Sequence, residues 1–448
     1  MKIDLPNKNK KGQVLIGLTV SIAVLAILTE VVISLVYTSY QILAFTQART
    51  NAKFIALNEI EIIKNLPYNS IGTVGGIPTG VLSQSKTTIR NGLTYTISTS
   101  VIYIDDQFDS IAPTDLLPTD YKRARVEVSW PGLAQSKTNP VVLVTDIAPK
   151  GVETTNGGGT LSILVFDSSG LPLSQANVHI VASTVNPAVD LNLKTATDGR
   201  VILPGAPACN GCYQITVTKS GYSTDRTYSS SEVTNPNKPH QTIIASNLTE
   251  VSFSIDLLSS INVTSTYGSQ NNFAVYPNRG FALQGTKQIG TDSLNNPVYK
   301  YKNGFQTDSL GNLTISNLEW DTYQFTSSDS ATLDLEAVNP TIPLIMYPNT
   351  QTQFTFAQTS HTANSLRVQF LGSGGSPIAS VAATLSQSSI PIATQSSGLS
   401  TDPNFGQVYF PSLSSGIYTI DATASGYLPY SAVATVSGQT VENINLTQ

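Results

Sequence analysis

Residues 13–66 have the sequence QVLIGLTVSIAVLAILTEVVISLVYTSYQILAFTQARTNAKFIALNEIEIIKNL, and this stretch predicts one long helix. From residue 13 to residue 48 the only charged side chain is that of Glu30. Residues 13–29 alone come close to the roughly 20 apolar residues that cross a bilayer as a helix. The basic segment of residues 1–12 favours a cytoplasmic amino terminus. We therefore expect a single-pass membrane helix whose amino terminus faces the cytoplasm.

The second half of this stretch keeps a helical spacing but becomes amphipathic. Apolar residues recur at intervals of three and four, and charged residues return between them. Pro67 disfavours helical geometry at Leu66, so we expect the helix to end there. A helix over residues 13–66 would be about 80 Å long, far more than a membrane anchor needs. The apolar positions of the second half are Phe45, Ala48, Ala52, Ile55, Ala56, Ile60 and Ile63.

The start of the helix and the residues before it resemble a known export signal. Residues 10–17, KKGQVLIG, followed by a long apolar helix, resemble the class III signal of type IV prepilins and pseudopilins. Residues 56–68 resemble the helix end of PilV-type minor pilins. The resemblance implies that a prepilin peptidase removes the leader, residues 1–12, by cleaving between Gly12 and Gln13. It also implies that the new amino terminus, Gln13, is methylated.

The same resemblance implies a location and partners. The chain would sit in the inner membrane before assembly and outside the cell, at its surface, afterwards. Its partners would be other pilin or pseudopilin subunits and the prepilin peptidase. The resemblance adds no cofactor.

The sequence departs from major pilins at two positions near the start of the helix. The first mature residue would be Gln13, where major pilins usually have Phe, and the fifth would be Gly17, where they usually have Glu. In assembled pilins that carboxylate is thought to pair with the amino terminus of the subunit ahead. A buried carboxylate is costly without a partner. Because a subunit with nothing ahead of it lacks this partner, Gly17 favours a tip or initiating position.

After Pro67 the apolar spacing changes from the helical period to the alternation of β-strands. A long helix followed by a small antiparallel sheet is the pilin head of the resembled family, so we expect that domain at residues 67–149. Residues 150–159 contain a run of three glycines and predict a flexible linker. The strands predicted in the head are residues 93–98, 101–104, 124–130 and 141–145.

The remainder of the chain repeats a pattern three times. In each copy a glycine precedes one alternating apolar run, and a tyrosine begins the following alternating run. We interpret the two runs as the strands of a hairpin whose turn needs the positive φ of glycine. Units of about 100 residues made of short strands fit β-sandwiches, so we expect these at residues 160–258, 259–360 and 361–448. The first and third resemble the carboxypeptidase regulatory-like, or transthyretin-like, domain, and the middle unit matches only at its hairpin. The repeated pairs are Gly199 and Tyr213, Gly311 and Tyr323, and Gly406 and Tyr418.

Cys209 and Cys212 are the only cysteines and form a Cys-x-x-Cys motif. Such a motif can be a redox centre or half of a zinc site. A redox centre needs the motif at the start of a helix, whereas here it lies in a turn before a predicted strand. A zinc site needs a second ligand pair. We therefore expect a disulfide that closes a very short loop outside the membrane.

The composition excludes several classes of protein. Charged residues make up 12% of the 448 residues, roughly half of the usual share, and the formal net charge is −5. No basic surface for nucleic acid is therefore expected. The three histidines lie far apart without a catalytic sequence pattern, so we expect no enzyme, no catalytic residue, no metal site and no cofactor.

Together these features predict an α+β chain with one long amino-terminal helix, a small antiparallel head sheet and tandem all-β sandwiches. The predicted function is that of a minor type IV pilin or pseudopilin at a filament tip or on its surface. Its β-sandwiches would be displayed for adhesion to a surface carbohydrate or protein. The alternative is a membrane-anchored extracellular module that binds carbohydrate or protein without entering a filament.

Overall fold

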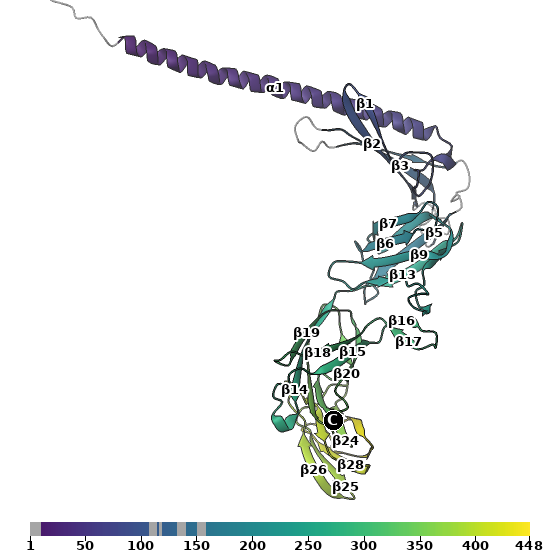
Figure 1. Cartoon of the computed structure of the whole chain (residues 1–448), viewed down its shortest axis with the longest axis vertical. Coiled ribbons are helices and arrows are strands. Elements are labelled where there is room, and N and C mark those ends of the chain that lie inside the picture. The colour runs from purple at the N-terminus through teal and green to yellow at the C-terminus, as the bar shows by residue number, and fades with distance from the viewer. Residues whose placement is uncertain (1–9, 107–113, 116–118, 132–139, 150–157) are drawn as a thin grey trace, which may run out of the picture.

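The computed structural model describes residues 10–106, 114–115, 119–131, 140–149 and 158–448, with the backbone alone described for residues 10–13. The chain is α+β, with one long helix at the amino-terminal end followed by a succession of β-sheets. Figure 1 shows the helix lying across one end of the molecule, with the β-sheets following one another away from it. Most of the predicted linker, residues 150–157, and most of the predicted leader, residues 1–9, lie outside the described residues.

The helix α1 spans Lys10–Lys64, so it begins before the predicted start and ends two residues before Leu66. The backbone N–H of Asn65 donates to the carbonyl of Glu61, and that of Leu66 donates to Ile63, which closes the last turn. Pro67 has an extended backbone with φ −56° and ψ 138°, as its ring favours. A short 3₁₀ helix, η1 (Tyr68–Ser70), follows it.

The head is a four-stranded antiparallel meander in the order β1-β2-β3-β4. The two runs predicted at residues 93–98 and 101–104 form one continuous strand, β2. The strand β1 was not predicted, because its sequence SKTTIR is polar and it lies at the exposed edge of the sheet. The strands are β1 (Ser85–Arg90), β2 (Leu93–Ile104), β3 (Tyr121–Ser129) and β4 (Val141–Ile147).

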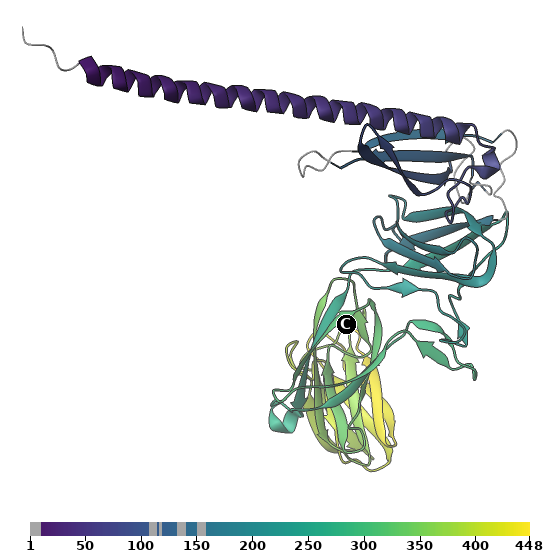
Figure 2. The ribbon, with the colours of Figure 1, turned by 45° about the horizontal axis from the view of Figure 1, so that its top comes forward.

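The head sheet packs against the carboxyl-terminal half of α1 (Figure 2). The amphipathic pattern predicted there is confirmed, since six of its seven apolar positions are buried. Ala48, Ala52 and Ala56 lie on one face at intervals of four, and their small side chains let the helix approach the sheet closely. The seventh position, Phe45, lies against Trp130 with ring centroids 6.2 Å apart.

The first β unit, residues 158–258, contains two facing sheets around one apolar core. Its first strand starts at Gly158, inside the predicted linker. A Cβ at Gly158 would lie 2.6 Å from the carbonyl oxygen of Gly205, and one at Gly159 would lie 2.3 Å from that of Ile244, so both glycines are needed for close packing. The sheets have the orders β13-β5-β8 and β10-β9-β6-β7, with β12 also on β9. The strands are β5 (Gly158–Phe166), β6 (Asn177–Ala182), β7 (Val189–Lys194), β8 (Arg200–Pro207), β9 (Cys209–Thr218), β10 (Asp225–Arg226), β11 (Asn235–Pro236), β12 (Gln241–Ile243) and β13 (Leu248–Ser254).

The second β unit, residues 259–360, has a core rich in phenylalanine. Its two sheets have the orders β19-β14-β23-β21 and β18-β15-β20-β22. The elements are β14 (Ser259–Tyr267), η2 (Ser269–Asn271), β15 (Gly280–Gly285), β16 (Gln288–Thr291), β17 (Pro297–Tyr299), β18 (Lys302–Gln306), β19 (Asn312–Leu318), β20 (Asp321–Ser327), β21 (Leu333–Asn339), β22 (Leu344–Met346) and β23 (Gln351–Ser360).

The third β unit, residues 361–448, has the sheet orders β27-β24-β30 and β26-β25-β28-β29 around its own core. The strands are β24 (Ser365–Leu371), β25 (Ala382–Gln387), β26 (Ile390–Ser396), β27 (Gln407–Phe410), β28 (Gly416–Thr423), β29 (Tyr430–Val436) and β30 (Gln439–Asn445).

All three units share one strand pairing. In each, the first strand pairs in parallel with the last strand and antiparallel with the strand that follows the repeated glycine. The middle unit, which matched the others only at its predicted hairpin, has the same arrangement. The carbonyls of Gly199, Gly311 and Gly406 each accept a 2.8 Å hydrogen bond from the first strand of their unit, and each glycine has φ near +70°.

The predicted hairpin itself is wrong. The strand after Gly199 is β8, which pairs with β5, whereas the next strand, β9, pairs with β6 in the facing sheet. The same separation holds for β19 and β20 and for β27 and β28. Alternation shows which side of a strand faces the core, but it does not show which strand is its neighbour.

The repeated tyrosines are buried where the chain crosses between the sheets. Tyr213, Tyr323 and Tyr418 are at most 2% exposed. Each hydroxyl donates a hydrogen bond to a carbonyl four to six residues earlier, at 2.7 to 2.8 Å, as in the tyrosine corners of other β-sandwiches. Burial raises the pKa of Tyr213 and of Tyr323, so both stay protonated as donors.

Polar contacts join the second and third units. The side-chain amide of Gln407 donates to the carbonyl of Val338, and its oxygen accepts from the N–H of the same residue. Asp334 is 1% exposed and accepts hydrogen bonds from the Tyr409 hydroxyl at 2.8 Å and the Thr362 N–H at 3.0 Å. Because these bonds are buried and directional, they fix how the two units meet.

Replacing Tyr323 by Phe is expected to lower the free energy of unfolding of the second unit by about 1 kcal/mol, because the Glu319 carbonyl loses its donor. Urea unfolding followed by the fluorescence of Trp320 in a Trp130→Phe background would measure this. Tyr347→Phe, at a position 65% exposed in the same unit, is the control and should leave the unfolding midpoint unchanged. Equal midpoints for both variants would contradict the tyrosine's role.

Candidate assembly interface

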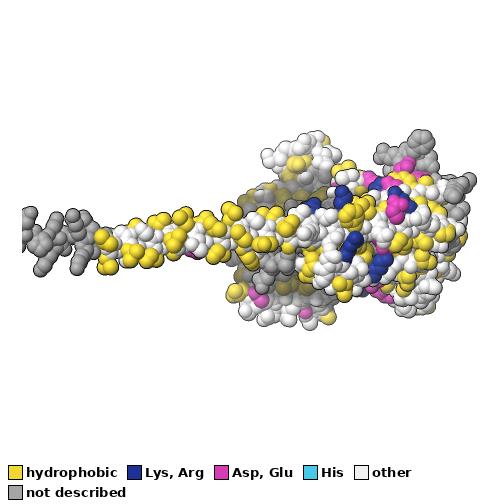
Figure 3. Space-filling view, turned by 90° about the horizontal axis from the view of Figure 1, so that it is seen from above, with side chains coloured by type: hydrophobic (Ala, Val, Ile, Leu, Met, Phe, Trp, Pro, Cys, Tyr) yellow, Lys and Arg dark blue, Asp and Glu magenta, His cyan; other side chains and the backbone are white. Residues whose placement is uncertain are grey.

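The amino-terminal half of α1 projects beyond the head, and Figure 3 shows apolar side chains along the visible face of this half. Large aliphatic side chains at successive positions of this half are exposed, so they point to all sides of the helix. It belongs to a helix, Val14–Lys64, that is long and apolar enough to cross a membrane. Aliphatic residues from Val14 to Leu43 are 47–72% exposed. A helix that is apolar on every face is stable only where lipid or other protein surrounds it.

Five of the six serine and threonine hydroxyls between Val14 and Leu43 donate hydrogen bonds within the helix. The Ser21 hydroxyl donates to the carbonyl of Gly17 at 2.8 Å, and that of Thr29 donates to Leu25 at 2.7 Å. Bonding to a carbonyl three or four residues earlier recurs at Thr19, Thr38, Ser39, Thr46 and Thr50. Such internal pairing suits an environment without water, where an unsatisfied polar group is costly.

Aromatic residues follow the most apolar part of the helix. Tyr37 and Tyr40 are 64% and 69% exposed. The distance along the helix from Val14 to Tyr37 is about 35 Å, close to the thickness of a bilayer's hydrocarbon core. Tyrosines are enriched at membrane–water interfaces, so their position matches the far interface of a bilayer that the helix enters at residue 14.

The residues of the predicted cleavage site lie at the start of α1. Gly12 and Gln13 have helical backbone, and the side chain of Gln13 is outside the described part of the structure. Cleavage and methylation at these residues therefore stay predictions. Gly17 lies little more than one turn further on, and a Cβ there would meet nothing within 4 Å. The packing of a single chain thus does not require glycine at position 17 and leaves room for the glutamate of major pilins.

An aromatic cluster fixes the point where the helix leaves the head. Trp130 lies between Phe45 and Tyr95, with ring centroids 6.2 Å and 6.0 Å away. The Tyr95 hydroxyl donates to the carbonyl of Ala48 on the helix at 3.3 Å. These contacts couple the head sheet to α1, so a force on the helix is transmitted to the head.

A groove of about 650 Å³ runs between α1 and the edge strand β1. Glu59 on its wall is 4% exposed and pairs with Lys86 at 2.8 Å. The guanidinium of Arg90 lies 5.9 Å from the ring of Phe54, which is 55% exposed. The groove combines exposed apolar side chains with cations beside the helix, so it offers a second contact surface next to the apolar half of α1.

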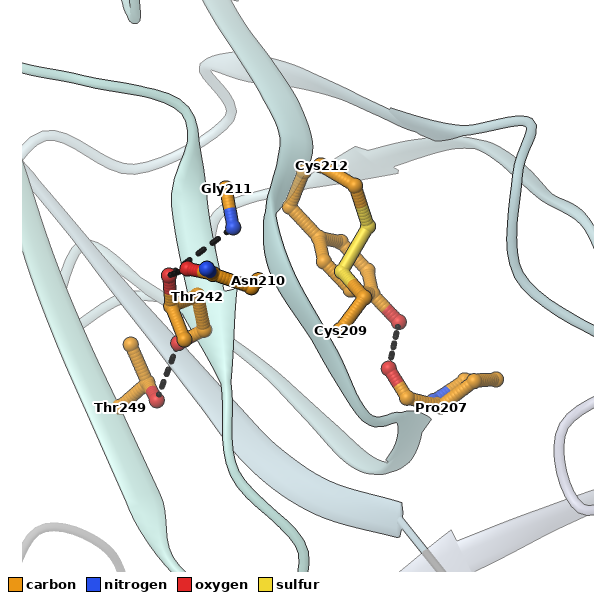
Figure 4. Close-up of a disulfide and its surroundings, with 8 residues drawn as sticks. Pro207, Cys209, Asn210, Gly211, Cys212, Thr242 and Thr249 are labelled. Atoms are coloured by element: carbon orange, nitrogen blue, oxygen red, sulfur yellow. Dashed lines mark hydrogen bonds between the residues drawn. A yellow bond between two sulfur atoms is a disulfide. The ribbon is translucent and has the colours of Figure 1, made fainter.

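The Cys-x-x-Cys motif forms a disulfide (Figure 4). Cys209 and Cys212 lie at the start of strand β9 rather than in a turn before it, because β12 pairs alongside them and continues the sheet. Gly211 has φ +60°, and its N–H donates to the Thr242 hydroxyl at 2.9 Å. The Thr242 hydroxyl in turn donates to the Asn210 side chain at 3.0 Å. The disulfide therefore braces an edge of the first unit, far along the chain from the apolar helix.

A buried lysine at the base of the head was not predicted from the sequence. Lys122 is 1% exposed, and its ammonium donates to the carbonyls of Tyr68 and Ile71 at 2.9 and 2.7 Å. The same ammonium lies 4.6 Å from the ring of Tyr68. Burial lowers the pKa of Lys122 to about 8. A single lysine in an alternating strand carries no sequence signal for such a role, because its two acceptors come from a segment about 50 residues earlier.

No protein-family model and no curated protein matches this sequence. Among solved structures, the Bacillus anthracis TIE protein is 12% identical, with 84% of this chain and 77% of that one covered and a TM-score of 0.19. GBS52, the minor pilin of Streptococcus agalactiae, is 12% identical over 42% of this chain and 96% of its own, with a TM-score of 0.18. BcpA, the major pilin subunit of Bacillus cereus, is 10% identical over 65% and 99%, with a TM-score of 0.16. These identities and scores are too low to assign a fold or a function to this chain.

The buried amine of Lys122 predicts a pH dependence of head stability. The folded head releases the lysine proton near pH 8, whereas the unfolded chain holds it to about pH 10.5. Between these values the unfolded chain binds more protons, so the free energy of unfolding rises with pH. Trp130 fluorescence during urea unfolding, in a Trp320→Phe background, would measure this rise.

Lys122→Met is expected to remove the rise and to destabilise the head by about 1–3 kcal/mol, because the buried carbonyl of Ile71 and the part-buried carbonyl of Tyr68 lose their donor. Lys53→Met, at an exposed position of the helix, is the matched control and should keep the rise. A pH profile of Lys122→Met that parallels that of the unmodified chain would contradict the assignment.

Proposed function

We propose that this chain is a minor type IV pilin or pseudopilin, a structural protein without enzymatic activity. The apolar half of α1 would insert among the helices of neighbouring subunits, and the β units would project from the filament for adhesion. The observation that carries this proposal is the exposed apolar segment from Val14 to Leu43, which continues as one helix into the core of the head.

The length of the helix favours a filament over a simple anchor. A membrane needs about 20 residues, yet α1 has 55 and uses its second half to hold the head sheet. The apolar half can therefore pass from lipid to a bundle of like helices while the head stays attached to the same rigid rod. The aromatic cluster at Trp130 and the small alanines on the buried face support this coupling.

The leader and the processing of Gly12 and Gln13 complete the proposal. A prepilin peptidase would cut between these two residues in the inner membrane, where residues 1–12 face the cytoplasm. Methylation of Gln13 would follow. After assembly the β units would lie at the cell surface, with a carbohydrate or protein as their adhesion ligand. The resemblance of the first and third units to carboxypeptidase regulatory-like domains is also part of the proposal.

Gly17 places the subunit at the tip of the filament in this proposal. Glycine adds no carboxylate for a subunit ahead to neutralise, and the monomer's own packing does not require it. The size of the projecting part supports the same position, because three β units follow the head and would crowd a closely packed shaft.

Gly12→Leu is expected to abolish maturation, because the peptidase of the resembled family cuts after glycine. Mass spectrometry of surface material from cells with an active prepilin peptidase should find the unmodified chain starting at methylated Gln13 and the variant retaining residues 1–12. Thr19→Ala, within the same helix, is the control and should mature normally. An unmodified chain that keeps its leader would instead indicate a membrane-anchored module outside any filament.

Gly17→Glu is expected to move the protein from the filament end into the shaft, because the new carboxylate can pair with the amino terminus of a subunit ahead. Immunogold labelling of the third unit on isolated filaments would show the position. Gly17→Gln has the same size without the charge and should keep end labelling. Unchanged end labelling of Gly17→Glu would count against the tip assignment, and side labelling of the unmodified chain would refute it.

A further inference from the structure

The apolar half of α1 carries one charged side chain, that of Glu30. Glu30 is exposed, and it forms no hydrogen bond or ion pair with any residue that the structure describes. Its position is about 24 Å along the helix from Val14 and about 10 Å before the level of Tyr37. A carboxylate at this depth is costly in lipid or among apolar helices unless a cation pairs with it. Glu30 therefore marks a place on the helix that a positively charged partner fits.

Ser34, one turn after Glu30, is a second polar group on the same side of the helix without a partner. The other serine and threonine hydroxyls of α1 all donate to carbonyls within the helix. The Ser34 hydroxyl forms no hydrogen bond with a described residue. Ala26 and Ala23 lie one and two turns before Glu30 on this side, and such small side chains let another helix approach closely. These features favour a protein partner over lipid on this side of the helix.

Two cations in the second half of α1 also lack a partner. Arg49 and Lys53 are exposed, and neither forms an ion pair or a cation–π contact within the described ranges of the chain. By contrast, Glu59, Glu61 and Lys64 on the same half all form ion pairs. Like charges one turn apart on a helix repel each other, so a carboxylate placed between them is stabilising. Arg49 and Lys53 thus form a site for a carboxylate from outside their own helix.

Glu30 and Lys53 lie on nearly opposite sides of the helix. Their separation in the sequence corresponds to a rotation of about 140° and a rise of about 35 Å. Such side chains cannot meet within one straight helix, but they can meet between two parallel copies, the Glu30 side of one against the Lys53 side of the other. If the second copy is displaced by about 35 Å toward its amino terminus, its Lys53 is level with Glu30 of the first, and its Arg49 is about 6 Å away along the axis. The charges on the two sides of the helix are then complementary.

We propose that Glu30 pairs with Lys53 and Arg49 of a second, parallel copy of this chain, offset by about 35 Å along the helix axis. The Ser34 hydroxyl would accept a hydrogen bond from the incoming ammonium. Because Gly17 supplies no carboxylate near the start of the helix, Glu30 would provide the charged contact between neighbouring copies. The proposal rests on the filament function proposed above and adds that two or more copies lie together at the filament end.

Disulfide crosslinking between two differently tagged full-length chains tests this offset. One chain carries Ala23→Cys and the other Thr46→Cys, which have the spacing of Glu30 and Lys53 two turns nearer the amino terminus and leave every proposed partner unchanged. Oxidation with copper phenanthroline, in membranes and filaments from cells with an active prepilin peptidase, should link the two chains. Gln47→Cys in place of Thr46→Cys is the matched control. Its side chain is turned by about 100° from that of Thr46, so it should crosslink at least about fivefold less.

Charge variants test whether the ion pair holds the two copies together. Glu30→Gln in the first chain should lower the crosslinked yield at least about fivefold, because the cations of the second chain lose their counter-ion. Glu61→Gln changes an acid of the same helix that already pairs with Lys64, and it should leave the yield unchanged. Glu30→Lys should lower the yield as well, and Arg49→Glu with Lys53→Glu in the second chain should restore it. Circular dichroism of the purified variants that matches the unmodified chain would show that each is folded.

Two results would overturn the pairing. One is an equal crosslinked yield for Thr46→Cys and Gln47→Cys, and the other is a yield that does not respond to Glu30→Gln. Mass spectrometry of the same samples reports removal of the leader separately. Processed chains without the crosslink would remove the pairing and leave the pilin function standing, whereas chains that retain residues 1–12 would count against the pilin function itself.

Discussion

The exposed apolar half of α1 is the constraint to which the rest of the structure responds. Burying one aliphatic side chain contributes about 1.5–3 kcal/mol, so the exposed residues from Val14 to Leu43 represent a driving force on the order of tens of kcal/mol toward lipid or protein. No head or β unit covers these side chains in the described structure. The segment must therefore reside in a membrane or against other protein. The head and the β units must stay folded and attached to the helix in either environment.

The attachment is achieved by changing the character of one continuous helix. Its first half is apolar on all sides and pairs most of its serine and threonine hydroxyls within the helix, whereas its second half buries one face of alanine and isoleucine against the head sheet. Trp130 and Tyr95 sit where the two halves meet. Because the helix has no break between Lys10 and Lys64, the head keeps its orientation when the surroundings of the first half change.

Beyond the head, the contacts between neighbouring β units are polar, whereas the core of each unit is apolar. Each β unit has its own apolar cluster, while Gln407, Asp334 and the β11–β16 pairing connect neighbouring units through directional hydrogen bonds. Such joints set orientation with little apolar area, which leaves room for a cavity between the first and second units that Trp320 helps to line. The separation of cores also explains why three units can share a topology and differ in their connections.

Local periodicity was enough to identify the helix, its amphipathic second half, most head strands and the strand that follows each repeated glycine. Two cysteines allow a single pairing, so the disulfide was also within reach of the sequence. The sequence did not predict the partners of β8 and β9 or the edge strand β1. It also did not predict the role of Gly158 and Gly159, the buried Lys122 or the cavity at Trp320. A repeating pattern of apolar residues reports which side of an element is buried. Which element packs or pairs next to it depends on contacts between segments that are tens of residues apart in the sequence. Those contacts form only in the folded chain.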